Sequence, residues 1–253
     1  MDFTIKKYNE LISSLIESNY NFQTFEEFLT KPKLKTIVLR HDVDLLPDRA
    51  LELARIQNNF GIKGSYYFRA VPESWDVNII KQIASLGHEI GYHYENLTIC
   101  KGNIASAIED FKSNLVELRK LADVKTICMH GSPRSKYDSK DLWNEFDYRE
   151  LDIIGEPYFD VDFNKVFYLT DTGRRWDGHK VSVRDKVQTS FKQTFKYTNE
   201  IITSTKKGKL PNQIMFTFHP ARWHQNYLMW SKELILQNIK NVIKKYFFVK
   251  KKK

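Results

Sequence analysis

The chain has 253 residues, of which 42% are hydrophobic and 14% aromatic, enough for one large globular domain with a sizeable core. No segment reaches the roughly eighteen consecutive apolar residues of a membrane span, and the two cysteines form no CxxC pair, which argues against a disulfide framework or a thiolate zinc site. The formal charge of +9 suits a substrate that carries phosphates, and no nucleic-acid-binding motif accompanies it.

Both ends of the sequence are informative. The start, MDFTIKKYNE, lacks the apolar region of a signal peptide, so we expect a cytoplasmic protein. The last residues, 244–253, read KKYFFVKKKK, and such lysine clusters with aromatics between them could make weak contact with a membrane surface. A frayed, solvated terminus is the alternative. Since no linker or composition break precedes this tail, we predict one domain over 1–253, beginning with helices in 1–34.

Strand and helix patterns alternate along the chain. Apolar residues at helical spacing predict a helix over 4–18, and the segment 24–27 has the form of a capping box that starts a second helix. Strands are expected at 35–40, 64–68, 88–92, 125–129, 166–169 and 214–218. Further helices are expected at 47–60, 77–86, 103–121, near 139, at 189–204 and at 230–245. This alternation predicts a parallel sheet with helices outside it.

A polar residue directly follows each of the predicted strands. In a parallel α/β barrel the strand ends share one face, on which active sites are built. Six side chains in equivalent positions are therefore expected to converge there: Asp42, Arg69, His93, His130, Asp171 and His219.

The stretch TIVLRHDVD, residues 36–44, joins a short apolar run to four ionisable groups. Asp42 and Asp44 are two residues apart, so in an extended chain they point to the same side. Two such carboxylates can divide the work of hydrolysis, one binding a metal while the other takes a proton from water. A solvated loop, or an aspartate that caps the helix starting at Pro47, is the alternative.

With these residues in view, the sequence from Thr36 to Trp223 resembles the polysaccharide deacetylases of carbohydrate esterase family 4. It is most similar to a divergent cytoplasmic branch associated with surface-polysaccharide (O-antigen or capsule) biosynthesis. The segments that carry the resemblance are HDVD, GHEIGYHYE, HGSP, TDTGRRWDG and FHPARW. The resemblance implies an α/β fold, a distorted seven-stranded (β/α) barrel, and a divalent metal, usually zinc, used to remove acetyl groups from sugars.

The resemblance also implies roles for the matched residues. Asp42 corresponds to the catalytic base and Asp44 to a metal ligand. His219 corresponds to the general-acid histidine that follows the last strand. His93 matches the first of two metal-ligand histidines, whereas the position of the second holds Leu97, which cannot bind a metal.

The third metal ligand is less directly indicated. The family normally places an arginine beside the catalytic base at the strand end where His130 stands. Since a catalytic zinc needs three protein ligands and an open position for water, we predict His130 as the third ligand. Glu95 is the rival, because it is close to His93 and its oxygen suits zinc. If only two ligands assemble, the protein is a weak metal binder or a pseudoenzyme.

Several further residues are candidates for substrate contact. Arg174, Arg175 and Arg222 could clamp a phosphate or carboxylate bidentately, with structural ion pairing as the alternative. Trp176 and Trp223 could stack on a sugar ring, although core packing is as good an interpretation. The remaining predicted contacts are Arg69, Glu95 and Asp171; Asp171 and Trp176 loosely occupy the family's fourth motif.

Together these features predict a metal-dependent hydrolase that removes an N-acetyl or other acyl group from an amino-sugar precursor of a surface glycan. The substrate is expected to be linked to a nucleotide or a lipid. Two alternatives remain open: a catalytically silent barrel that binds a glycan or nucleotide-sugar, which Leu97 favours, and an amide hydrolase that acts on a non-sugar substrate.

Overall fold

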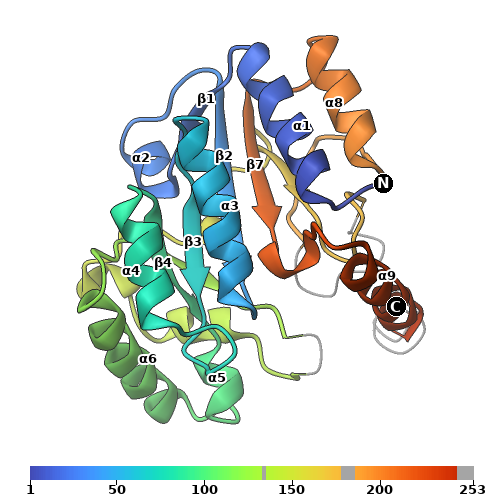
Figure 1. The fold of residues 1–253 in the computed structure, drawn as a ribbon. Coiled ribbons are helices and arrows are strands. Elements are labelled where there is room, and N and C mark those ends of the chain that lie inside the picture. Colours follow the sequence, from blue (N-terminus) through green and yellow to red (C-terminus); the bar gives the residue numbers. More distant parts are fainter. Residues whose placement is uncertain (133–134, 178–185, 244–253) are drawn as a thin grey trace.

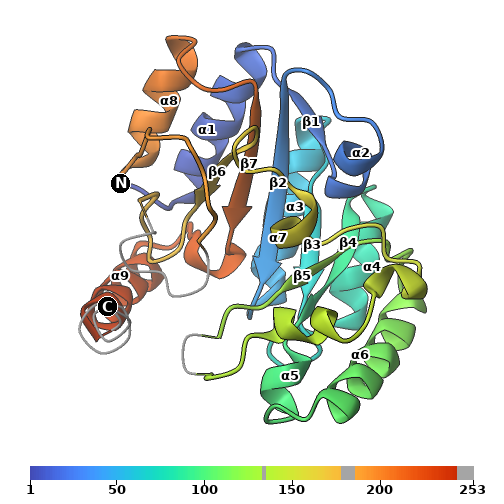
Figure 2. The same cartoon turned by 180° about the vertical axis from the view of Figure 1, so that it is seen from behind.

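A computed structural model describes residues 1–132, 135–177 and 186–243 (Figures 1 and 2). Its strands form a single sheet in which every pairing is parallel, in the order β5-β4-β3-β2-β7-β6, with β1 beside the first half of β2. The strands are β1 (Asn21–Gln23), β2 (Thr36–Val43), β3 (Ser65–Phe68), β4 (Glu89–Tyr94), β5 (Ile127–Met129), β6 (Phe167–Thr170) and β7 (Gln213–Phe218).

The predicted seven-stranded (β/α) barrel is confirmed, in a distorted and incomplete form. The strands run parallel with helices between them, as the right-handed crossover connections of such a fold require. Within the described residues no ladder joins β5 to β6, so the barrel stays open between these two edge strands. The carboxyl ends of all the strands meet at one edge, and the site lies there.

Helices alternate with the strands along the chain. They are α1 (Ile5–Glu17), α2 (Phe25–Thr30), α3 (Pro47–Asn59), α4 (Val77–Ser85), α5 (Asn96–Ile99), α6 (Ile104–Arg119), α7 (Pro157–Asp160), α8 (Thr198–Lys206) and α9 (Tyr227–Ile243), with short 3-10 turns at Ser139–Asn144, Tyr148–Leu151 and Pro220–Arg222. None of the helices in the described residues is long and apolar enough to cross a membrane.

Local sequence signals explain where several helices begin. The predicted capping box at α2 is present: the Thr24 side chain accepts from the backbone N–H of Glu27, and the Glu27 side chain accepts from the N–H of Thr24. Pro47 occupies the first turn of α3, where its missing N–H has no intrahelical role. Asp76 caps α4 by accepting from the next two free backbone N–H groups.

Strand β2 runs through the centre of the sheet and is buried along its whole length. Its side chains alternate between two environments, as a pleated strand requires. Ile37 and Leu39 pack toward the outer helices. Val38 packs inside the barrel, where Phe25 and Phe28 of α2 fill the end opposite the site. The next side chains on the inner face are those of Arg40 and Asp42, so the sequence places charge inside the barrel.

Some predicted boundaries were wrong. β2 continues to Val43, so Asp42 lies inside the strand rather than after it. The helix expected at 189–204 begins only at Thr198. Three short elements, β1, α5 and α7, were not predicted, because three or four residues give no measurable periodicity. The basic tail at 244–253 lies outside the described residues.

Candidate active site

Arg40 and Asp42 form a buried ion pair on the inner face of β2. The guanidinium of Arg40 donates through Nε to Asp42 Oδ1 at 2.8 Å and through Nη2 to Oδ2 at 2.6 Å. Burial raises the pKa of the Asp42 carboxyl, but the charge and hydrogen bonds of Arg40, together with the nearby histidines, lower it by more in total, and the pKa lies below its usual value. Asp42 is therefore an ionised acceptor with a fixed orientation.

His41 points the other way, into the outer core. Its Nε2 lies 2.8 Å from Gln57 Nε2 and its Nδ1 lies 3.1 Å from the carbonyl oxygen of Ser65. The ring stacks on Tyr66 with centroids 4.1 Å apart. His41 is thus a packed core histidine and takes no part in the site.

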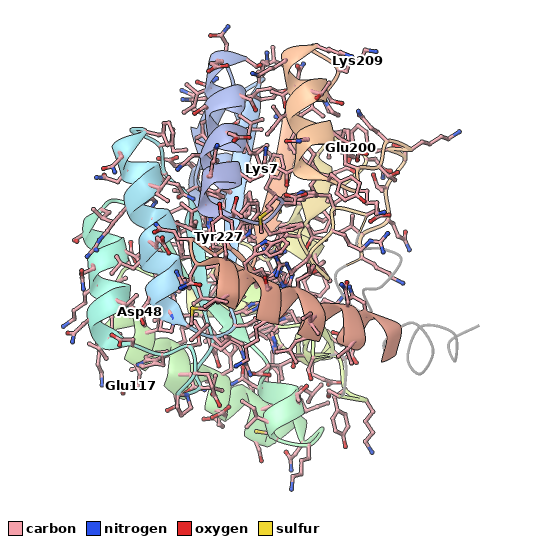
Figure 3. The ribbon with its side chains drawn as sticks, turned by 45° about the vertical axis from the view of Figure 1, so that its right-hand side comes forward. Lys7, Asp48, Glu117, Glu200, Lys209 and Tyr227 are labelled. Carbon is pink, nitrogen blue, oxygen red and sulfur yellow. The ribbon has the colours of Figure 1, made fainter. Side chains whose placement is uncertain are left out.

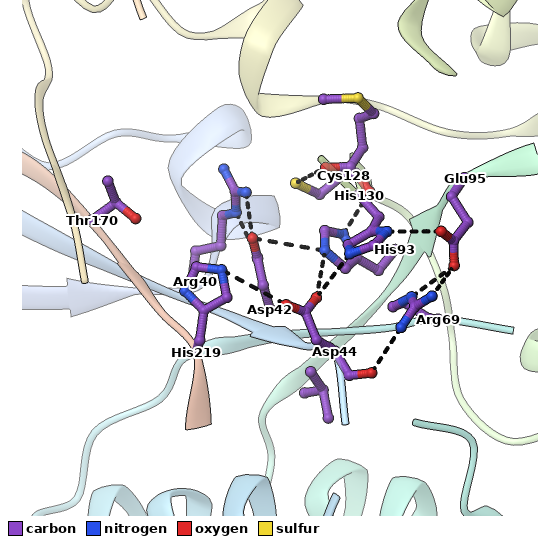
Figure 4. A network of polar contacts seen from close by, with 12 residues as sticks. Arg40, Asp42, Asp44, Arg69, His93, Glu95, Cys128, His130, Thr170 and His219 are labelled. Carbon is purple, nitrogen blue, oxygen red and sulfur yellow. Dashed lines mark hydrogen bonds and ion pairs between the residues drawn. The ribbon is translucent and has the colours of Figure 1, made fainter. Parts of the chain in front are cut away.

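Asp44 follows β2 and faces three histidines (Figure 4). Its Oδ1 lies 3.4 Å from His93 Nε2 and 3.5 Å from His130 Nε2, and its Oδ2 lies 3.9 Å from His219 Nε2. Oδ1 is buried and has no hydrogen-bond partner. Two atoms bound tetrahedrally to one zinc are about 3.4 Å apart, given metal–ligand distances near 2.1 Å. The spacing around Oδ1 thus fits a shared cation.

The Nδ1 atoms of His93 and His130 make contacts that fix the orientation of the two rings. His93 Nδ1 lies 2.9 Å from the carbonyl oxygen of Cys128, and His130 Nδ1 lies 2.8 Å from Glu95 Oε2. Both partners only accept, so both Nδ1 atoms carry a proton and donate it, and each ring turns its Nε2 toward Asp44. Donation from the far ring nitrogen to a carbonyl or carboxylate is the usual environment of a metal-binding histidine.

Glu95 and Arg69 hold His130 and the loop of Asp44 in place. Arg69 donates through Nε to Glu95 Oε1 at 2.7 Å and through Nη1 to the backbone carbonyl of Asp44 at 3.0 Å. Glu95 is 6% exposed, and its oxygens are engaged by Arg69 and His130. The two residues expected to contact substrate therefore tie the loops after β2, β3 and β4 together, and the geometry favours His130 over Glu95 as a ligand.

Leu97 packs in the core rather than at the site. It lies on α5, is 4% exposed and belongs to the same apolar cluster as Phe111. The family's second ligand histidine would stand there, but in this chain His130 reaches Asp44 from the end of the neighbouring strand β5. A second histidine nitrogen near Asp44 thus comes from strand β5.

A second set of donor atoms lies nearby. One ligand atom each from Asp42, His93 and Cys128 lie within 4.8 Å of one another. Both Asp42 oxygens already accept from the Arg40 guanidinium, which would repel a cation bound between them. We therefore favour the set that contains Asp44, whose inner oxygen is without a partner.

His219 lies on the other side of the site, and its ring contacts the buried carboxylate of Asp171. Its Nδ1 lies 2.6 Å from Asp171 Oδ1, and its backbone N–H donates to Asp171 Oδ2 at 3.0 Å. Burial and Arg222 lower the pKa of the imidazole, Asp171 raises it, and the net direction is upward. Trp223 Nε1 donates to Asp171 Oδ2 at 2.8 Å and Arg222 Nη1 to Oδ1 at 2.8 Å. Asp171 is 0% exposed.

The arginines and the aspartate predicted to contact substrate have partners within the protein, and their contact with substrate stays a prediction. Asp171 orients the ring of His219 through Nδ1, and Arg222 donates to the same carboxylate. Arg175 forms an ion pair with Asp177, and Arg174 donates to the carbonyl oxygen of Trp230 at 2.9 Å. In the described residues these arginines serve the packing of the loops and of α9.

The two tryptophans are core residues, which decides between the two interpretations. Trp176 is 3% exposed and donates to Thr198 Oγ1 at 2.8 Å. Trp223 is completely buried. Both pack against Phe218 of β7, with ring centroids 5.6 Å apart in each pair. Neither side chain offers a ring face on which a sugar could stack.

Arg40 is the site residue that sequence reasoning missed. The signal was present, because residues two apart on a strand share a face, and Arg40 precedes Asp42 by two. The strand boundary predicted at residue 40 hid it. Arg40 stands beside the proposed base, the place where the family has an arginine from another strand.

Comparisons with known proteins add the following findings. No family model matches the sequence, and no curated protein matches it significantly. Among solved structures, a carbohydrate esterase family 4 pseudoenzyme from Bacillus anthracis is 11% identical with a TM-score of 0.45, covering 83% of this chain and 62% of its own. A family 4 carbohydrate esterase from the same organism is 13% identical with a TM-score of 0.45, covering 95% and 92%. A mutant of a peptidoglycan deacetylase from Bacillus subtilis is 9% identical with a TM-score of 0.46, covering 83% and 87%. The chain thus spans less than two thirds of the first of these proteins.

Proposed function

We propose that this protein is a metal-dependent hydrolase of the polysaccharide deacetylase type, which removes an N-acetyl or other acyl group from an amino sugar. The proposal rests on the position of Asp44 Oδ1. This oxygen is buried, lacks a hydrogen-bond partner, and lies 3.4 Å from His93 Nε2 and 3.5 Å from His130 Nε2. A base and an acid flank this group, namely Asp42 and His219. A module that only binds sugar has no need for all three features together.

Asp44, His93 and His130 would hold the cation, and oxygen with two imidazole nitrogens is a donor set typical of zinc. When bound, such a cation lowers the pKa of a water molecule and polarises an acyl carbonyl.

The protein's own groups move the protons. Asp42, held ionised by Arg40, accepts a proton from the attacking water. His219, whose pKa is raised, carries a proton on Nε2 and donates it to the leaving nitrogen as the C–N bond breaks. Asp171 accepts from Nδ1 and stabilises the charged ring. These roles balance, since the proton gained by Asp42 matches the one that His219 gives up.

The finer identity of the substrate is part of the proposal. We take it to be an acetamido sugar carried on a nucleotide or a lipid, as a precursor of a surface glycan, because the net charge of +9 favours an anionic carrier. The proposed setting is the cytoplasm, where the free thiols of Cys100 and Cys128 would persist.

An acetate-release assay on the zinc-loaded chain tests the activity. Nucleotide-linked and lipid-linked N-acetylamino sugars are offered in parallel with a simple anilide, so that sugar and non-sugar amides are compared directly. Asp42→Asn should lose turnover by roughly 10²- to 10⁴-fold while keeping the metal. Asp48→Asn, which alters an exposed aspartate at the start of α3, is the matched control and should leave turnover unchanged. Sugar binding without acetate release from the metal-loaded protein would identify a silent binding barrel instead.

A further inference from the structure

Helix α9 carries its apolar side chains on its outer face. Leu228 is 82% exposed, Ile235 61% and Ile239 53%. These positions are separated by seven and four residues, so they form one stripe along a helix. Met229 and Leu236, 53% and 42% exposed, widen the stripe. We call these five side chains the α9 stripe.

The face of α9 that packs on the protein is more polar than the face turned to solvent. Gln237 is 5% exposed, and Asn241 donates through Nδ2 to the carbonyl oxygen of Gly173 at 2.9 Å. A helix that serves only to cover the core shows the opposite pattern, with apolar residues inside and polar residues outside. The exposed side of α9 is thus more apolar than covering the core requires.

Specific contacts hold α9 in this orientation. Trp230 Nε1 donates to the carbonyl oxygen of Asp2 at 2.7 Å, and the Arg174 guanidinium lies 5.0 Å from the centre of the Trp230 ring. Gly173 and Arg174 belong to the loop after β6, which also carries Asp171. These contacts therefore keep the stripe on the outward side of the docked helix. They involve the loop that also carries Asp171, the residue that orients His219.

Exposed apolar side chains also follow the proposed ligand Asp44 in the chain. Figure 3 shows the start of α9, at Tyr227, beside α3, and Arg49 of α3 contacts the sulfur of Met229 at 3.7 Å. Leu45 and Leu46, which directly follow Asp44, are 42% and 49% exposed. Exposed apolar side chains thus lie both beside a proposed ligand and on the helix.

Positive charge accompanies this surface. Lys232 is exposed on α9, and the sequence after the helix, 244–253, contains six lysines and three aromatic residues. An apolar helix face followed in the sequence by a lysine cluster is a combination that favours a helix lying flat on an anionic bilayer. A second copy of the chain is a poorer occupant, because copies that each carry +9 repel one another.

We propose that the α9 stripe docks the protein on the surface of an anionic lipid bilayer. The helix lies in the interface rather than crossing it, since its other face is bound to the barrel. If the hydrolase function proposed above holds, this contact brings the site to a substrate whose carrier lies in the membrane. The docking itself does not depend on activity.

Sedimentation with lipid vesicles tests the proposal on the full-length chain. The protein should bind phosphatidylglycerol vesicles and bind phosphatidylcholine vesicles much more weakly. Changing Leu228, Ile235 and Ile239 together to Gln should weaken binding to the anionic vesicles by roughly tenfold or more. Changing Lys250, Lys251, Lys252 and Lys253 to Gln should reduce the preference for anionic lipid.

The matched control changes exposed apolar residues elsewhere. Ile104 and Val116 of α6, 36% and 56% exposed, become Gln in the control, and vesicle binding should stay as in the parent. Thermal unfolding of all variants checks that each one is folded. Unchanged vesicle binding by the folded stripe variant would overturn the proposal. A stable dimer of the parent in light scattering, with the stripe variant monomeric, would also overturn it, because a second copy of the chain would then cover the stripe.

Discussion

The guanidinium of Arg40 binds both carboxylate oxygens of Asp42 from two residues earlier on the same strand, at 2.8 and 2.6 Å. Both side chains are about 99% buried inside the barrel, with exposures of 1% and 2%. The proposed base is thus oriented and kept ionised by its own strand. No loop has to close for this pair to form.

Removing one partner of this pair should be costly. Arg40→Met leaves a buried carboxylate without its counter-charge and should lower the free energy of unfolding by about 3–5 kcal/mol. Adding Asp42→Asn in the same chain should recover part of that loss, because the orphaned charge is gone. Urea unfolding of the parent, both single variants and the double variant measures the coupling. An Arg40→Met chain as stable as the parent would show that the pair does not form.

Asp171 should matter for turnover and not for the metal. Asp171→Asn keeps the shape of the side chain but no longer stabilises a protonated His219, so kcat should fall on the order of 10²- to 10⁴-fold, about as far as in His219→Gln. Zinc affinity should stay within about twofold in both variants, because neither residue belongs to the proposed ligand set. Loss of zinc in His219→Gln would instead make His219 a ligand.

His130 and Glu95 should differ in their effect on zinc binding. His130→Ala removes a donor atom and should raise the zinc Kd by more than roughly a hundredfold. Glu95→Gln removes only the negative charge of the acceptor that holds His130 Nδ1 and should raise the zinc Kd by roughly 10- to 100-fold. Calorimetric titration ranks the two variants. The reverse order, with the metal lost in Glu95→Gln and kept in His130→Ala, would exchange their roles.

His41 should make the fold sensitive to acid. Burial lowers its pKa from 6.5 to about 3, so below pH 6.5 the unfolded chain takes up a proton that the folded chain does not. The free energy of unfolding should therefore fall as the pH falls, by about 1.4 kcal/mol per pH unit from this residue alone. His41→Gln lacks that proton uptake, so its stability should depend less on pH between 6.5 and 4.5. Parallel slopes in urea unfolding at several pH values would contradict this.

The sequence predicted the sheet well because each buried strand is a short apolar run that ends in a polar residue. The same argument located Asp44, His93 and His130 at one edge, and their role as ligands stays a prediction. Spacing alone could not predict the partners of the arginines. Arg222 binds Asp171 across 51 positions of the chain, and only the packing of β6 against β7 brings them together.

Aromatic residues illustrate the same limit. Trp176 and Trp223 follow strands and stand beside arginines, which suits either a sugar platform or a core. Their packing around Phe218 depends on α1 and on the first residues of the chain, where Phe3 lies 5.2 Å from Trp223 between ring centres. Such a contact, between opposite ends of the chain, leaves no local pattern in the sequence.

Zinc titration of the intact chain tests most directly whether Asp44, His93 and His130 bind one cation. Calorimetry, with elemental analysis of the dialysed protein, should give one zinc per parent chain. Asp44→Ala and His93→Ala should each lose it, and Asp42→Asn should retain it. A parent chain that binds no zinc, or full zinc occupancy in Asp44→Ala and His93→Ala, would contradict the metal site.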